Sequence, residues 1–153
     1  PFIRKIFAMT LFLSALTGFA QMPIFKRYYI ADIPGLGWLA EFYVTYTLHY
    51  ISAIAFIAII SYLIAHYILL GRHSLRVTIY GYARAIMLAL ILTTGILLVF
   101  RNLPGYRYTP EFVVALDFSH LGLVVLFLVV TLVGRLMGKR WVVDAAARSA
   151  PSI

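Results

Sequence analysis

The chain has 153 residues, of which 63% are hydrophobic and 12% are charged. Soluble domains carry about twice that share of charged residues, so the composition predicts a protein that lies in a lipid bilayer. It contains no cysteine, which excludes c-type haem attachment, iron–sulfur ligation and thiol–disulfide exchange by this chain. The net charge of +8 is not arranged as a basic run with interleaved aromatic residues, so we expect membrane anchoring and no nucleic-acid binding.

Four apolar segments are long enough to cross a hydrocarbon core, which takes about 20 helical residues. In chain order they cover residues 2–22, 42–70, 79–100 and 112–137. They predict an all-α membrane protein, a four-transmembrane-helix bundle in one domain over residues 1–153, with a short C-terminal tail. The apolar part of the first segment follows Arg4 and Lys5, as the hydrophobic region of a signal peptide follows its basic residues. It is long for the hydrophobic region of a signal peptide and is not followed by a small-residue cleavage site, so we expect a retained helix.

Basic residues divide unequally between the ends of these segments. Nine of the 13 Lys and Arg lie near the two chain ends or around the second connection, whereas four lie in the first and third connections with four of the five acids. The positive-inside rule therefore predicts that both termini are cytoplasmic and that the first and third connections face outside.

A short pattern occurs twice along the chain. The first segment carries Thr17-Gly18, and the second then carries His49. The third segment carries Thr94-Gly95, and the fourth then carries His120. We interpret this as a weak pseudo-repeat of helical hairpins, an organisation that often holds a ligand at the repeat interface. Plain helix packing is the ordinary alternative for the glycines.

The two repeated histidines are the candidate ligands. At 1.5 Å per residue, His49 and His120 both lie about 10–12 Å below the outer ends of their helices. Two imidazoles at one depth suit bis-histidine haem, so we predict that His49 and His120 bind the iron of a haem b. Basic residues of the outer connections are candidate partners of the haem propionates: Lys26, Arg27, Arg101 and Arg107. Interhelical hydrogen bonding and a proton path are the alternatives.

Two further expectations concern residues around this pair. Asp117, about one turn before His120, or Ser119, directly before it, is expected to fix the tautomer of an imidazole. His66, near the inner end of the second segment, is a candidate ligand of a second haem or of a quinone. No histidine of another segment lies at its level, and the position fourteen residues after His120 is Gly134. We therefore expect one haem and leave the second open.

The motifs together resemble those of a known family. The order Arg4-Lys5, Leu16-Thr17-Gly18 and Leu48-His49-Tyr50, followed by His120, is similar to the cytochrome b subunits of membrane-bound formate dehydrogenases and nickel–iron hydrogenases. The resemblance covers all four segments and implies electron transfer through haem b between menaquinone or ubiquinone and a partner outside the membrane. The family's outer haem matches His49 and His120. Its inner haem does not match, because residues 4–7 and Gly134 stand at the ligand positions.

We therefore expect an electron-transfer component of an oxidoreductase complex rather than a stand-alone enzyme, with no catalytic residue of its own. The expected setting is the bacterial inner membrane, with an iron–sulfur or multihaem protein as the partner on the outer side. Two alternatives remain: a cofactor-free anchor or quinone-binding subunit, and a small proton channel or transporter that uses His49, Asp117 and His120 as a relay.

Overall fold

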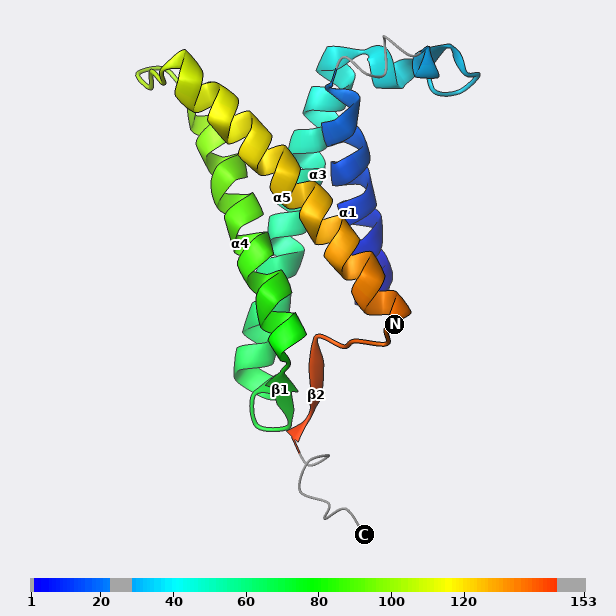
Figure 1. The fold of residues 1–153 in the computed structure, drawn as a ribbon, viewed down its shortest axis with the longest axis vertical. Coiled ribbons are helices and arrows are strands. Elements are labelled where there is room, and N and C mark those ends of the chain that lie inside the picture. Colours follow the sequence, from blue (N-terminus) through cyan, green and yellow to red (C-terminus); the bar gives the residue numbers. More distant parts are fainter. Residues whose placement is uncertain (1, 23–28, 146–153) are drawn as a thin grey trace. The chain divides into compact units, whose positions relative to one another are not determined.

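The structure, a computed structural model, describes residues 2–22 and 29–145. Four helices dominate it and confirm the predicted all-α membrane class: α1 (Phe2–Ala20), α3 (Phe42–His66), α4 (Ile79–Phe100) and α5 (Pro110–Leu136) (Figure 1). Each is long and apolar enough to cross a membrane. Their ends lie within two residues of the predicted ones, except that α3 ends at His66 and continues as the π-helix η3 (Tyr67–Gly71).

The chain divides into two compact units, residues 1–68 and 69–153, and each contains one helical hairpin. In the first unit, α1 and α3 pack antiparallel. The Phe7 ring lies 5.3 Å from the Phe56 ring, and further along α1 the Ser14 hydroxyl donates to that of Ser52, which comes earlier in α3, at 3.0 Å. The connection contains two short 3₁₀-helices, η1 (Ile30–Asp32) and η2 (Gly37–Ala40). The prediction of a single domain over the whole chain stays a prediction.

In the second unit, α4 and α5 form the other hairpin, and two short strands lie beside the start of α4 (Figure 1). Strand β1 (Leu75–Val77) pairs antiparallel with β2 (Val142–Asp144). The Thr78 hydroxyl accepts a hydrogen bond from the Gly81 amide at 2.9 Å and so caps α4. Pro110 begins α5, where its missing amide proton leaves no helical hydrogen bond unmade. The strands thus attach the segment after α5 to the first turn of α4.

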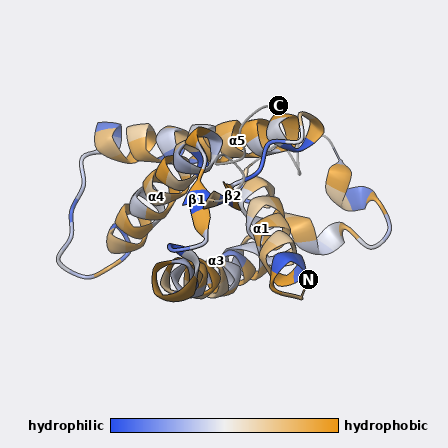
Figure 2. Ribbon diagram, turned by 90° about the horizontal axis from the view of Figure 1, so that it is seen from below, coloured by the Kyte–Doolittle hydropathy of each residue, from blue (hydrophilic) through white to orange (hydrophobic). Residues whose placement is uncertain are grey.

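Large apolar side chains point outward along all four helices. They include Met9, Ile54, Ile86 and Leu132, each at least 59% exposed. Figure 2 shows the same distribution, with hydrophobic colouring over the helices and hydrophilic colouring concentrated in the connections. Apolar surface of this extent is stable in lipid and not in water. The chain has the helices of a multi-pass membrane protein.

Candidate functional site

In the first hairpin, α1 holds the imidazole of His49 by one ring nitrogen. Nδ1 of His49 lies 2.9 Å from the carbonyl oxygen of Ser14 and 3.3 Å from the hydroxyl oxygen of Thr17. A carbonyl oxygen only accepts hydrogen bonds, so Nδ1 carries the proton and donates it. In a neutral imidazole this leaves the lone pair on Nε2, which is the atom that binds a metal.

In the second hairpin, α4 holds His120 in a similar way. Nδ1 of His120 lies 2.9 Å from the hydroxyl oxygen of Thr94. The single proton of that hydroxyl is directed at the carbonyls of Leu90 and Ile91, at 2.9 and 3.0 Å. The Thr94 oxygen therefore accepts from Nδ1, and the geometry favours the same tautomer as in His49.

Thr17 behaves as its counterpart Thr94 does. Its hydroxyl donates to the Leu13 carbonyl at 2.7 Å, one helical turn earlier, and so presents a lone pair to the His49 ring. Thr17 is fully buried, at 0% exposure. Each hairpin thus pairs a threonine of its first helix with the Nδ1 atom of a histidine of its second helix.

The glycine after each threonine makes room for the ring. An ideal Cβ atom at Gly18 would lie 3.1 Å from Cε1 of His49, and one at Gly95 would lie 3.3 Å from Cε1 of His120. These glycines therefore serve close approach between helices, and the group that approaches is the imidazole. The same construction at Gly122 meets no atom within 4 Å.

The two contacts occupy corresponding places in hairpins of different length. Thr17 lies three residues before the end of α1, and His49 lies seven residues after the start of α3. In the second hairpin, Thr94 lies six residues before the end of α4 and His120 lies ten residues after the start of α5. Both helices therefore extend about one turn further beyond the contact than in the first hairpin. At 1.5 Å per residue His49 is about 10 Å from the start of its helix and His120 about 15 Å. The predicted depth of 10–12 Å therefore holds for His49, whereas His120 lies further along its helix because α5 starts two residues earlier than expected.

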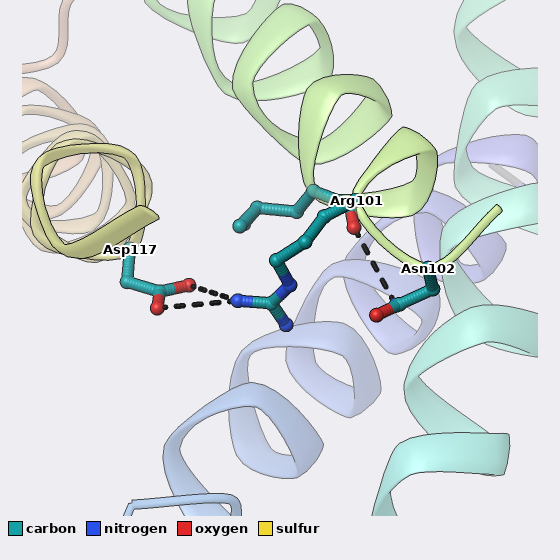
Figure 3. A network of polar contacts seen from close by, with 4 residues as sticks. Arg101, Asn102 and Asp117 are labelled. Carbon is teal, nitrogen blue, oxygen red and sulfur yellow. Dashed lines mark hydrogen bonds and ion pairs between the residues drawn. The ribbon is translucent and has the colours of Figure 1, made fainter. Parts of the chain in front are cut away.

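The residues that fix the tautomers were not those expected from the sequence. Asp117 pairs with Arg101, its carboxylate 3.4 Å from Nη1, and the two side chains point toward each other from α5 and the end of α4 (Figure 3). Thr94 contacts His120 instead. The repeated Thr-Gly pair is the sequence signal for these contacts, and both of its residues meet the imidazole.

The other predicted residues lie away from these contacts. Arg101 is 35% exposed in its pair with Asp117, and Arg107 is exposed in the connection between α4 and α5. His66 is the exposed last residue of α3, with its ring 5.9 Å from that of Tyr62. Lys26 and Arg27 lie outside the described residues.

A histidine at position 134 would have no room in this hairpin. A Cβ atom at Gly134 would lie 2.6 Å from Cε1 of Tyr80 and would overlap Nη2 of Arg84. The place to which the family resemblance assigns an inner haem ligand is therefore filled by two side chains of α4.

Within the described parts of the chain, no group of three or more His, Asp or Glu side chains is arranged to hold a metal ion. A bis-histidine haem needs only two protein ligands, because the porphyrin nitrogens supply the other four. Comparisons of the chain with protein-family models, with curated proteins and with solved structures give no match.

Proposed function

We propose that the chain is the haem-b electron-transfer subunit of a quinone-linked membrane oxidoreductase, with His49 and His120 as the axial ligands of one haem. The observation that supports this most is the repeated contact between threonine and Nδ1 of histidine. Donation from Nδ1 leaves the lone pair of a neutral imidazole on Nε2, and a metal-bound histidine likewise donates its other ring N–H to a nearby acceptor.

Interhelical hydrogen bonding accounts for either threonine–histidine contact on its own. It accounts less well for the same contact occurring in both hairpins. A threonine that holds a helix pair together needs no histidine, and a buried imidazole is expensive in lipid. The glycine beside each threonine brings the ring against the helix, which fixes its position as well as its tautomer. Fixed position and tautomer are what an axial ligand requires.

The remaining residues have supporting roles in this proposal. When bound, haem b accepts and releases one electron at a time. The Thr17 and Thr94 hydroxyls and the Ser14 carbonyl orient the ligand rings, and Arg101 and Arg107 are candidates to neutralise propionates. In this proposal both termini lie in the cytoplasm of a bacterial cell, and the excess of basic residues near the chain ends supports that orientation. Electrons would pass between menaquinone or ubiquinone and an iron–sulfur or multihaem subunit on the outer side of the inner membrane.

The test is the haem content of the protein purified with its native partners. A dithionite-reduced minus oxidised spectrum should show a b-type α band, and pyridine haemochrome should give about one haem per chain. His49→Ala and His120→Ala should each abolish this α band. His73→Ala is the matched control, because His73 is exposed beyond η3 and its ring accepts a hydrogen bond from the neighbouring Arg72.

The two alternatives predict other outcomes. A cofactor-free anchor or quinone-binding subunit contributes no b-type α band to its native complex, although its histidines are intact. A proton channel or transporter carries ions into liposomes with no redox partner, and His49→Ala or His120→Ala stops that flux. A native complex without haem b would exclude the haem proposal.

A further inference from the structure

A second polar location lies in the α4–α5 hairpin, far along both helices from His120. Arg84 is only 3% exposed, although it lies on a membrane-length helix. Its guanidinium lies over Gly134 of α5, between two aromatic rings: its Cζ atom is 5.0 Å from the Tyr80 ring centre and 5.2 Å from that of Trp141. The rings stabilise the cation, but they accept no conventional hydrogen bond.

Several polar atoms at this location lack a hydrogen-bond partner. Among the described residues, the buried side-chain nitrogen and oxygen atoms without one are Nε and Nη2 of Arg84 and Oγ1 of Thr131. Thr131 is three residues before Gly134 and so lies on the same face of α5. Buried polar groups are nearly always satisfied, and such a group points to a water or ion at the site.

The missing partner has to be an anion or a strong acceptor. Arginine stays charged in proteins, and a buried unpaired charge is strongly unfavourable. In the described parts of the chain, the one ion pair is that of Arg101 with Asp117, near the opposite end of the hairpin. Asp144, on β2 of the same unit, is exposed and forms no ion pair with Arg84.

The surroundings favour a negatively charged ligand. Exposed basic residues gather at the same end of the second unit: Arg76, Arg135, Lys139 and Arg140. The first turn of α4, which contains Tyr80, adds the positive end of a helix dipole. Tyr and Trp side chains such as Tyr80 and Trp141 are typical of the headgroup level of a bilayer.

We propose that Arg84, with Thr131, binds a phosphate group at this end of the α4–α5 hairpin. The planar guanidinium offers parallel N–H donors that match two oxygens of one phosphate. The phosphate belongs either to the headgroup of an anionic phospholipid or to free phosphate. This inference is independent of the haem proposal, because neither histidine contributes to the site.

The experiment measures phosphate binding to the full chain with its co-purifying subunits, after removal of lipid by detergent exchange. The protein is reloaded with phosphatidylglycerol or phosphatidylcholine, and retained lipid phosphorus is counted per chain. The wild type should retain one phosphatidylglycerol more than Arg84→Gln, and Arg84→Lys should retain an intermediate amount. Arg72→Gln removes an exposed arginine of the same unit that is not among the basic residues named above, and it should retain as much as the wild type.

The thermal unfolding midpoint separates the two sources. Binding to the folded state should raise the midpoint of the wild type by about 5 °C and leave Arg84→Gln unchanged. A rise with phosphatidylglycerol alone assigns the phosphate to a lipid, and an equal rise with inorganic phosphate assigns it to the free ion. Should Arg84→Gln fail to fold, Thr131→Val takes its place, with reduced retention expected.

The proposal would be overturned if the variant of Arg84 or Thr131 retained as much lipid as the wild type and had the same thermal midpoint with both probes. Haem content, measured on the same samples, should not change in the Arg84 variants, so failure of one proposal is distinguishable from failure of the other.

Discussion

The two hairpins agree at one location and differ at another. Both hold a histidine Nδ1 atom against a threonine of the preceding helix, beside a glycine. Further along, the first hairpin packs apolar rings, with Phe7 against Phe56, whereas the second buries Arg84 over Gly134. If the contact of threonine and glycine with histidine served packing alone, the two hairpins would have no reason to share it and to differ further along. The comparison therefore separates a shared ligand-holding element from a feature that belongs to the second hairpin alone.

The largest effect is expected from filling the space beside the rings. Gly18→Leu or Gly95→Leu places a bulky side chain where a Cβ atom already lies 3.1 or 3.3 Å from Cε1 of the histidine. The ring has to move, so each variant should lose most of its haem, as measured by pyridine haemochrome. Gly122→Ala is the control, because its Cβ atom meets nothing within 4 Å. It should keep the haem, and equal losses in all three variants would contradict the assignment.

A smaller effect, on stability, is expected in the second hairpin. The Cβ atom of Gly134→Ala would overlap Arg84 and come within 2.6 Å of Tyr80. Overpacking of this kind typically destabilises by about 1–3 kcal/mol. The thermal midpoint should therefore fall, while the haem content of the folded protein stays the same. A fall in haem without a fall in midpoint would show that position 134 belongs to the haem site after all.

The threonines are expected to tune the haem rather than to hold it. Thr17→Val and Thr94→Val keep the side-chain shape and remove the hydroxyl that contacts Nδ1. A weaker hydrogen bond makes the ligand less basic, so the midpoint potential should rise by tens of millivolts, since about 1 kcal/mol corresponds to about 43 mV for one electron. Thr94→Val should have the larger effect, because its contact is 2.9 Å against 3.3 Å for Thr17. Redox titration measures both, and serine at either position should restore the potential.

The smallest effect is expected at the surface pair. Arg101 and Asp117 are 35% and 51% exposed at 3.4 Å, and exposed ion pairs contribute about 0–1 kcal/mol. Asp117→Asn should therefore change the thermal midpoint by no more than about 3 °C and leave the haem spectrum unchanged. Loss of the haem in this variant would instead make Asp117 part of the ligand environment, as the sequence first indicated.

Apolar periodicity and length were enough to predict the four helices, because hydrophobic spans are the strongest signal in a sequence. The pair of histidines could be selected too, since a repeated pattern is visible in one dimension. The roles of Thr17 and Thr94 could not be predicted, because a hydroxyl contact depends on the rotation of one helix against another. The same holds for Arg84: its charge indicated a membrane end, but only packing against Gly134 and Trp141 reveals that it is buried.

The most direct test of the account is chemical rescue of the ligands. His49→Gly and His120→Gly should each lose the low-spin ferric haem spectrum of the wild type, and added imidazole should restore it by binding iron in the space left by the ring. The ferric haem of His73→Gly should be low-spin both with and without added imidazole. A wild-type complex without haem, or a low-spin spectrum that survives in either ligand variant without imidazole, would contradict the central claim that His49 and His120 hold one haem.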